Sequence, residues 1–359
     1  MPTIRVLACR LRYNPGIPSG GGVMHVGFHM GPVVLHPYPL EQQWKEHLEQ
    51  VRAARDHGFD FVSVGTHWVI HPFQYFSLIP WLARINGEVP EMTLVTSVVL
   101  LPLVNPVDMA EKLATLDIMS GGKLKFGCGL GYRPLEYEFF GISLKHRAPR
   151  FEEALTLMKR LWTEDEVTHH GRFFNITGAK PTLKPLQKPY PPVWIATNSE
   201  PATRRAARMG DAPFWSPFQN VTVLKRHLEL YKATLKEEGK PWPKEVPMAR
   251  EYSVGRTHAE AVRDGAAGMV EKFAAYAEHG LQGSLAEKDK KLLDEFDTMA
   301  KDTFIVGDPA ECANEILRYR DIAGITHMKL RLQYPGMSHE KVMERIKLSE
   351  QVIKRLPQG

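Results

Sequence analysis

Eight short apolar segments alternate with helical patterns along this chain, and that alternation limits the possible folds more than any other feature. Each segment has the length of a strand and is followed by a stretch with apolar residues at helical spacing. The segments are 24–28, 59–64, 93–100, 124–128, 192–196, 212–215, 248–254 and 327–332. Repeated strand and helix units form parallel sheets, and eight of them close a TIM barrel. The sequence therefore predicts an α/β fold, a (β/α)8 TIM barrel with insertions.

The helical patterns between these segments are well marked. Segment 40–57 ends before Gly58, where glycine is a common helix stop. Segment 150–162 carries Phe151, Leu155 and Met158 at the spacing of a buried helical face. Both segments therefore predict helices that pack against the barrel.

One domain accounts for most of the chain in this interpretation. Residues 24–359 form a single barrel domain, and residues 1–23, which include three consecutive glycines, form an N-terminal extension. Two stretches, near 168–191 and 281–302, are longer than a usual barrel connection and are predicted to be insertions. Long connections of this kind form lids or walls of an active site, or they elaborate the surface.

Composition and charge argue against several classes of protein. The formal net charge is +5, and the basic residues are interleaved with acidic ones, as in 224–239, so no nucleic-acid-binding patch is predicted. The three cysteines, Cys9, Cys128 and Cys312, are widely spaced and odd in number, which predicts neither a disulfide framework nor a zinc knuckle. A reducing interior fits this cysteine usage.

No membrane segment is predicted. The longest apolar run, 92–104, is shorter than the roughly 20 residues of a membrane-spanning helix and contains Pro102. At the N-terminus, Arg5, Arg10 and Arg12 interrupt the apolar residues that a signal peptide requires. The expected location is cytoplasmic.

The segment 117–141, DIMSGGKLKFGCGLGYRPLEYEFFG, combines a helix end, a turn, a buried strand and a glycine-rich strand end. Gly127, Gly129 and Gly131 leave room for a flat ligand to approach the backbone. A dinucleotide-binding loop requires GxGxxG and an acidic residue about 20 positions later. Here the third glycine comes one place early, and Arg147 stands where the acid is expected. The pattern therefore argues against a Rossmann fold.

The same segment resembles the bacterial luciferase-like superfamily of flavin-dependent oxidoreductases. Members of that superfamily share an LD-x-x-S-G-G-(R/K) turn before a strand that ends in glycines, followed by Glu and then by Phe-Gly or a similar pair. Here these residues run from Leu116 to Gly141, and the resemblance extends roughly over 24–356 with the motifs in the same order. It implies a TIM barrel whose active site lies at the carboxyl ends of the strands.

The resemblance implies a set of cofactor-binding residues. PPVWIATNSEPATRRAARMGD, at 191–211, is similar to the phosphate site of the superfamily, where Ser199 caps a helix whose first N–H groups bind phosphate. Arg204 and Arg205 add positive charge nearby, although a plain helix cap beside two solvated arginines is the alternative. Tyr132 matches a tyrosine that contacts the phosphate in some relatives. The implied cofactor-binding residues are Ser97, Gly129, Leu130, Tyr132, Thr197, Asn198, Ser199 and Thr203.

Ser97 lies in VTSVVLLP, where relatives place a bulge with a non-prolyl cis peptide bond beneath the flavin ring. The resemblance therefore predicts a cis bond at Ser97–Val98 or one bond earlier. The alternative is an ordinary polar residue in a strand.

His67 is implied to be catalytic. In GTHWVIHP it matches the histidine that relatives hold near the reacting edge of the flavin, where an imidazole can act as an acid or a base near neutral pH. A metal site shared with His71 is not predicted, because Pro72 argues against a helix and no HExxH glutamate is present.

Arg250 and Tyr252 are also implied to be catalytic. They lie in MAREYSVGRT, which resembles the seventh-strand motif of sulfonate-oxidising relatives. Arg250 aligns with an active-site arginine that can hold an anionic oxygen, and Tyr252 stands where some relatives have histidine. The alternative for Arg250 is a salt bridge to Glu251 or to a neighbouring strand.

A cluster of aromatic residues after His67 has two interpretations. It either walls an apolar substrate pocket or packs in the core. Its members are Trp68, Phe73, Tyr75, Phe76 and Trp81.

The implied activity is that of a flavin-dependent monooxygenase, in which reduced FMN from a partner flavin reductase and O2 oxygenate a small organic substrate in a cavity that excludes water. The alternative is an F420-dependent oxidoreductase, which transfers hydride without oxygen. A further alternative is a flavin-binding protein without catalysis. The resemblance also implies a homo-oligomer, because luciferase-like barrels commonly pair through early helices. No metal, nucleic acid or membrane partner is expected.

Overall fold

Eight of the described strands form a closed parallel barrel. The computed structural model describes residues 22–278, 296 and 300–358. The strands follow one another around the barrel in chain order, and the pairing of β14 with β1 closes the ring. This confirms the predicted TIM barrel, and each predicted segment overlaps one barrel strand. The barrel strands are β1 (His25–Met30), β3 (Phe61–Val64), β5 (Thr93–Thr96), β7 (Leu124–Gly129), β10 (Val193–Thr197), β11 (Ala212–Trp215), β12 (Pro247–Val254) and β14 (His327–Arg331).

The predicted strand 93–100 is divided in two. β5 ends at Thr96, and a second short strand, β6 (Val99–Leu100), pairs with the end of β7. The peptide bond between Ser97 and Val98, which separates the two strands, is cis, as predicted. Both residues therefore lie at the carboxyl edge of the barrel.

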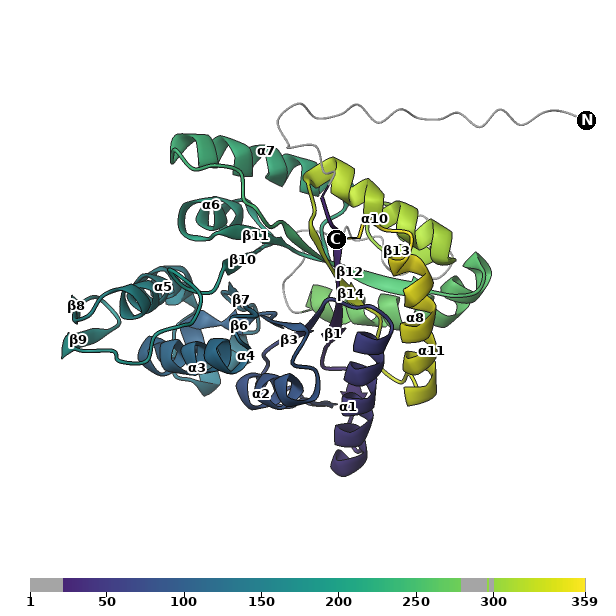
Figure 1. Ribbon diagram of the computed structural model, residues 1–359, viewed down its shortest axis with the longest axis horizontal. Coiled ribbons are helices and arrows are strands. Elements are labelled where there is room, and N and C mark those ends of the chain that lie inside the picture. Colours follow the sequence, from purple (N-terminus) through teal and green to yellow (C-terminus); the bar gives the residue numbers. More distant parts are fainter. Residues whose placement is uncertain (1–21, 279–295, 297–299, 359) are drawn as a thin grey trace, which may run out of the picture.

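Helices cover the outside of the barrel (Figure 1). The two helices predicted in detail are α1 (Leu40–Asp56) and α5 (Arg147–Thr163), and α5 buries Phe151, Leu155 and Met158 as expected. The other described helices are α2 (Leu78–Glu88), α3 (Pro106–Met119), α4 (Pro134–Phe139), α6 (Glu200–Met209), α7 (Val221–Glu237), α8 (His258–Glu278), α10 (Pro309–Ala323) and α11 (His339–Ile353). Within the described part of the chain, no helix is both long and apolar enough to cross a membrane.

Short strands are added outside the barrel. One pairs with the end of β12, and the others form two small antiparallel pairs. They are β13 (Ile305–Gly307) beside β12, β2 (Val34–Leu35) with β4 (Phe73–Gln74), and β8 (Val167–His170) with β9 (Asn175–Ala179).

The predicted insertion near 168–191 begins with the hairpin of β8 and β9, which lies beside α5 at the left of Figure 1. The Glu153 carboxylate on α5 accepts hydrogen bonds from the backbone N–H groups of Phe173 (3.0 Å) and Phe174 (2.8 Å), so the hairpin is fastened to the helix. The predicted insertion near 281–302 and the predicted extension 1–23 lie mainly outside the described residues.

The LDxxSGG motif ends α3 and begins β7. Asp117 is fully buried, and its carboxylate accepts hydrogen bonds from the backbone N–H (2.9 Å) and the side-chain amide (2.6 Å) of Gln187. Gly121 and Gly122 then have φ angles of 64° and 80°, which side chains other than glycine rarely adopt. The motif therefore holds the segment before β10 against α3 and turns the chain into the barrel.

Aromatic and small side chains fill the barrel interior below the carboxyl ends of the strands. Gly27 is required in β1, because a Cβ atom there would lie 1.9 Å from the Phe61 ring. At the amino-terminal end, the rings of His25 and His327 stack with centroids 4.7 Å apart. Space for a ligand is therefore left at the carboxyl end. The interior cluster consists of Phe61, Val95, Trp194, Ala212, Phe214 and Ala249.

An aromatic cluster packs α1 against α2, with Trp81 buried and Trp44 and Phe76 partly buried. The Trp44 ring lies 5.6 Å from the Phe76 ring and 4.8 Å from the Trp81 ring, measured between centroids. The His47 ring meets the edge of Phe76 at 5.8 Å. Of the aromatic residues expected either in a pocket wall or in the core, Phe76 and Trp81 thus belong to the core. Burial lowers the pKa of His47 to about 4, with a smaller contribution from the nearby His339.

Replacing His47 is predicted to make the protein less sensitive to acid. The pKa of His47 lies lower in the folded protein than its ordinary value of 6.5, so the unfolded chain takes up this proton first. The contribution of the neutral imidazole to stability is therefore complete above pH 6.5 and is lost as the pH falls toward 4. When the pH falls from 7 to 5, the free energy of unfolding of His47→Leu should decrease by about 1–2 kcal/mol less than that of the unchanged protein.

Urea unfolding at the two pH values measures this difference. His170→Leu, at an exposed position in β8, is the matched control and should retain the full acid sensitivity. Equal losses in His47→Leu and in the unchanged protein would contradict the prediction.

Candidate active site

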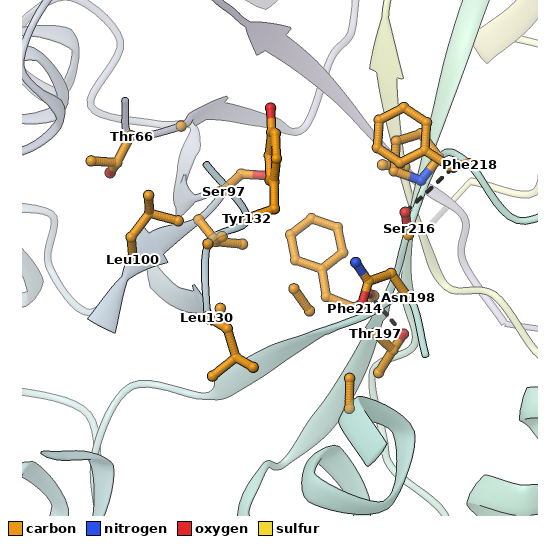
Figure 2. Close-up of a pocket in the computed structure, with 18 of the residues that line it drawn as sticks. Thr66, Ser97, Leu100, Leu130, Tyr132, Thr197, Asn198, Phe214, Ser216 and Phe218 are labelled. Atoms are coloured by element: carbon orange, nitrogen blue, oxygen red, sulfur yellow. Dashed lines mark hydrogen bonds between the residues drawn. The ribbon is translucent and has the colours of Figure 1, made fainter. Parts of the chain in front are cut away.

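A cavity of about 620 Å³ lies at the carboxyl ends of the barrel strands. Every barrel strand, or the loop that follows it, contributes to the lining. Figure 2 shows the space with Thr66, Leu100 and Leu130 on one side and Ser216 and Phe218 on the other. The volume falls within the roughly 300–1,000 Å³ that is usual for small-molecule sites. The carboxyl ends of the strands, where the site was expected, therefore surround one cavity.

The glycine-rich end of β7 forms one wall of the cavity through Gly129, Leu130, Gly131 and Tyr132. Gly127 lies deeper, where a Cβ atom would come within 2.0 Å of the Thr96 carbonyl oxygen. At Gly129 a Cβ atom would approach the Val98 side chain to 3.0 Å. Close packing between strands therefore requires glycine at Gly127, in addition to the room for a ligand that the sequence indicated.

Ser97 lines the cavity next to a lysine that the sequence interpretation missed. Nζ of Lys329 donates a hydrogen bond of 2.6 Å to Oγ of Ser97 and lies 5.2 Å from the centre of the Phe214 ring. Two positions further along β14, Nη1 of Arg331 lies 2.9 Å from Oε1 of Glu251. Both β14 side chains line the cavity. Charged residues at alternate positions of an apolar strand were the available signal, because alternate residues share one face.

His67 lines the cavity and is held by a buried glutamate on α4. Nδ1 of His67 lies 2.9 Å from Oε1 of Glu136, and the same oxygen accepts the Trp68 backbone N–H at 3.0 Å. Burial alone raises the pKa of Glu136, but the hydrogen bonds from His67 and Trp68 and the charge of Arg133 outweigh it and lower that pKa below its ordinary value. Glu136 is therefore ionised near neutral pH. Sequence reasoning placed this glutamate in the family motif without giving it a function.

The end of β10 and the start of α6 form another wall, to which Thr197, Asn198 and Ser199 contribute. Ser199 is the N-cap residue of α6, as expected, but its side chain makes no cap hydrogen bond. Its hydroxyl and the first N–H groups of the helix remain available for an anion. The hydroxyl of Thr197 is not available, because it donates to the Phe214 carbonyl oxygen at 3.1 Å inside the barrel.

The structure corrects the expected position of Thr203. Its side chain is fully buried and does not line the cavity. Its hydroxyl donates a hydrogen bond of 3.0 Å to the Ser199 carbonyl oxygen, one turn earlier in the same helix. A threonine at the fourth position of a helix commonly satisfies its hydroxyl in this way. Thr203 therefore cannot contact a ligand in the cavity without a change of rotamer.

The arginines expected near a phosphate point elsewhere. Nε of Arg205 donates to Glu152 at 2.8 Å, and Nη1 of Arg204 lies 3.9 Å from a Glu237 oxygen. Neither side chain lines the cavity. Arg147, at the start of α5, lines it instead. The sequence could not indicate this residue, because α5 reaches the cavity only through the folding of its preceding loop.

The structure also corrects Arg250 and Tyr252, which were expected to be catalytic. Their neighbour Ala249 lines the cavity, whereas Arg250 and Tyr252 are fully buried on the outer face of β12. Nη1 of Arg250 donates to the Ser216 carbonyl oxygen and Nη2 to that of Gln219, both at 2.9 Å. The hydroxyl of Tyr252 lies 3.0 Å from that of Ser349 on α11. Side chains alternate between the two faces of a strand. Arg250 and Tyr252 therefore lie on the face opposite Ala249, and both are outside the site.

The cavity fits a flavin-type cofactor. Val98, Leu100, Leu130 and Phe214 give it apolar walls suited to an aromatic ring system. The uncapped start of α6 suits a phosphate. The Thr66 hydroxyl oxygen lines the same cavity and is buried without a hydrogen-bond partner in the described part of the chain, which a bound polar ring would supply.

Comparison with known proteins agrees with this geometry. The luciferase-like monooxygenase family matches residues 24–327. An uncharacterized protein of Sinorhizobium fredii, y4vJ, is 32% identical over 168 residues, which are 45% of this chain and 46% of that protein. The chain thus aligns with about half the length of this relative. An F420-dependent glucose-6-phosphate dehydrogenase of Amycolatopsis mediterranei is 27% identical over 330 residues, 86% of this chain and 93% of that enzyme.

Solved structures share the fold. The monooxygenase RslO1 from Streptomyces bottropensis superimposes with a TM-score of 0.80 at 25% identity and covers 91% of this chain and 98% of its own. The oxygenating constituent of 3,6-diketocamphane monooxygenase from Pseudomonas putida, in complex with FMN, has a TM-score of 0.78 at 18% identity, over 94% of this chain and 100% of its own. At that identity the second likeness shows the barrel fold alone.

Arg250→Lys is predicted to lower the free energy of unfolding by about 2–4 kcal/mol, because one ammonium nitrogen cannot occupy the positions of both Nη1 and Nη2, which bind the Ser216 and Gln219 carbonyl oxygens. Thermal and urea unfolding measure the loss. Arg256→Lys, where the side chain is 69% exposed and pairs with Glu344, is the control and should be nearly neutral. A stable Arg250→Lys protein without turnover would contradict this prediction and indicate that Arg250 takes part in the reaction.

Proposed function

Because the chain belongs to the luciferase-like monooxygenase family, we propose that this oxidoreductase uses reduced FMN and O2 to oxygenate a small organic substrate, with the reduced FMN supplied by a partner reductase. The observation that carries the proposal is the cavity at the carboxyl ends of the barrel strands, which combines apolar walls with an uncapped helix start. Bound reduced FMN supplies the electrons with which O2 is activated.

The phosphate of the cofactor binds at the start of α6 in this proposal. Asn198 and Ser199 are exposed there, and the helix dipole adds a partial positive charge. Arg147 supplies a full positive charge to the same cavity. Ser97, Gly129, Leu130 and Tyr132 contact the ring system and its ribityl chain from the β5 and β7 side, with Thr197 contributing through its backbone.

His67 holds or donates a proton at Nε2 in this proposal, because its Nδ1 is occupied by Glu136. An imidazole in that position can hydrogen-bond a developing oxyanion or protonate it near neutral pH. Phe214, Phe218 and Leu100 line the surrounding cavity and exclude water from the reacting atoms. Arg250 and Tyr252 act only by holding β12 and its neighbours.

A second candidate is an F420-dependent oxidoreductase that transfers hydride without oxygen. The similarity to the Amycolatopsis mediterranei dehydrogenase, which extends over most of both chains, favours it. The apolar cavity with His67 at its edge suits a deazaflavin as well as a flavin. The two candidates therefore differ in the cofactor and in the use of oxygen, and both can be tested without knowing the substrate.

We predict that the purified protein binds reduced FMN more tightly than reduced F420 and changes the rate at which reduced FMN reacts with oxygen. Anaerobic titrations followed by absorbance measure the two dissociation constants, and stopped-flow mixing with oxygenated buffer measures the rate against reduced FMN alone. Tighter binding of F420 together with oxygen-independent substrate turnover would overturn the FMN proposal. FMN binding without product from any candidate substrate would favour the flavin-binding protein without catalysis.

Ser199→Asp is predicted to weaken FMN binding on the order of tenfold or more without loss of stability. Aspartate is a good N-cap residue, so the fold should be kept or slightly stabilised, while its negative charge repels a phosphate at the start of α6. Ser338→Asp makes the same change at the N-cap of α11, outside the cavity, and should leave FMN affinity unchanged. Unchanged affinity in Ser199→Asp would place the phosphate elsewhere.

A further inference from the structure

Glu136 is a buried carboxylate whose contacts converge on the loop that carries His67. Its side chain is 1% exposed, and that of His67 is 13% exposed. One oxygen, Oε1, lies 2.9 Å from Nδ1 of His67. The same oxygen accepts hydrogen bonds from the Trp68 backbone N–H at 3.0 Å and from Nη1 of Arg133 at 3.5 Å. The loop after β3 and the loop after β7 are therefore joined through this single oxygen.

Ring contacts join the same two loops on either side of the carboxylate. The His67 ring meets the Tyr132 ring edge-on with centroids 5.8 Å apart. The Trp68 and Phe140 rings meet at 4.8 Å in the same manner. The Tyr137 hydroxyl donates to the Leu130 carbonyl oxygen, which holds α4 against the end of β7. The position of the imidazole is therefore set by packing as well as by the hydrogen bond.

The charge of Glu136 determines what the imidazole can do. An ionised carboxylate only accepts hydrogen bonds, so Nδ1 of His67 must carry a hydrogen. The second oxygen, Oε2, is buried and has no hydrogen-bond partner among the described residues. The carboxylate is therefore joined to the loop that carries His67 through Oε1 alone.

We propose that Glu136 is a positioning residue that fixes His67 with Nδ1–H toward α4 and Nε2 toward the cavity. Glu136 touches neither the cofactor nor the substrate, and it acts through His67 alone. The proposal rests on the catalytic role proposed for His67. It makes Nε2 the nitrogen of His67 that faces the cavity and exchanges a proton with the reacting atoms.

Other titratable groups near His67 do not replace this carboxylate. Tyr132 packs against the ring edge-on, and Arg133 is a cation that shares Oε1 of Glu136. The cavity is further lined by Arg147, Lys329 and Arg331, whose cationic groups accept no hydrogen bond, and by His29, whose Nδ1 lies 3.0 Å from the Ser63 hydroxyl oxygen. Among the described residues that line the cavity or contact His67, Glu136 is thus the one acidic side chain.

The first test reads the tautomer of His67 directly in the full-length protein. Histidine labelled with isotopic nitrogen gives an NMR correlation spectrum that distinguishes Nδ1–H from Nε2–H, and His67→Gln assigns the signal. We expect the Nδ1–H form at high pH in the unchanged protein and its partial replacement by Nε2–H in Glu136→Gln, whose amide group can also donate. The Nε2–H form in the unchanged protein would overturn the proposal, and this measurement does not depend on whether the variant folds.

The second test measures catalysis with FMN and a turned-over substrate. Glu136→Gln should lower kcat about 10–100-fold, as loss of an orienting partner usually does, with little change in FMN affinity. Glu136→Asp, which keeps a carboxylate that only accepts hydrogen bonds, should recover part of the lost kcat. Glu138→Gln on the exposed side of α4 is the control and should change neither kcat nor FMN affinity.

The two tests separate the proposals. A changed tautomer with unchanged kcat would support the positioning of His67 by Glu136 and refute the catalytic role of His67. An unchanged tautomer in a folded Glu136→Gln protein would refute the positioning itself. If Glu136→Gln lost FMN affinity and kcat by equal factors, Glu136 would shape the cavity rather than position the imidazole of His67.

Discussion

The parallel pairing of β1 with β14 is the constraint on which the rest of the structure depends. Four residue pairs, from His25 opposite His327 to Phe28 opposite Leu330, join the first barrel strand to the last. With the ring closed, all eight described barrel strands point their carboxyl ends in one direction, and the loops that follow them surround one cavity. Residues that are hundreds of positions apart, such as Ser97 and Lys329, can then form a hydrogen bond.

The alternation of side chains along the strands decides which of these residues reach the cavity. In β12, Ala249 faces inward, while Arg250 and Tyr252 face the surrounding elements. Arg250 thereby stabilises the loop after β11 by binding its carbonyl oxygens, and so shapes the cavity from behind. A family motif aligns residue types, but it does not state which face of the strand a given residue occupies. That is why the two catalytic assignments on β12 failed while the strand itself was placed correctly.

Much of the candidate site was nevertheless predictable. The cis bond at Ser97–Val98 and the glycine-rich wall from Gly129 to Tyr132 lie where the motifs indicated, because local sequence and strand position suffice to place them. Glu136 and His67 are 69 positions apart, and their hydrogen bond depends on the packing of two loops from different strands. No local pattern encodes such a contact, and a hydroxyl such as that of Thr203 can be taken up by its own helix.

The sequence by itself determined the order of strands and helices, the barrel they form and the edge at which the site lies, because hydrophobic periodicity and glycine turns act over short distances. The tertiary structure decided which side chains share the cavity. The cavity is lined by Lys329, Arg331 and Arg147, whereas Arg204 lies outside it beside Glu237. Ion pairs and strand faces are decided only when all eight barrel strands are in register. The partner of His67 is decided in the same way. Glu136 lies 69 positions away along the chain, and the packing of two loops brings its buried carboxylate to the imidazole.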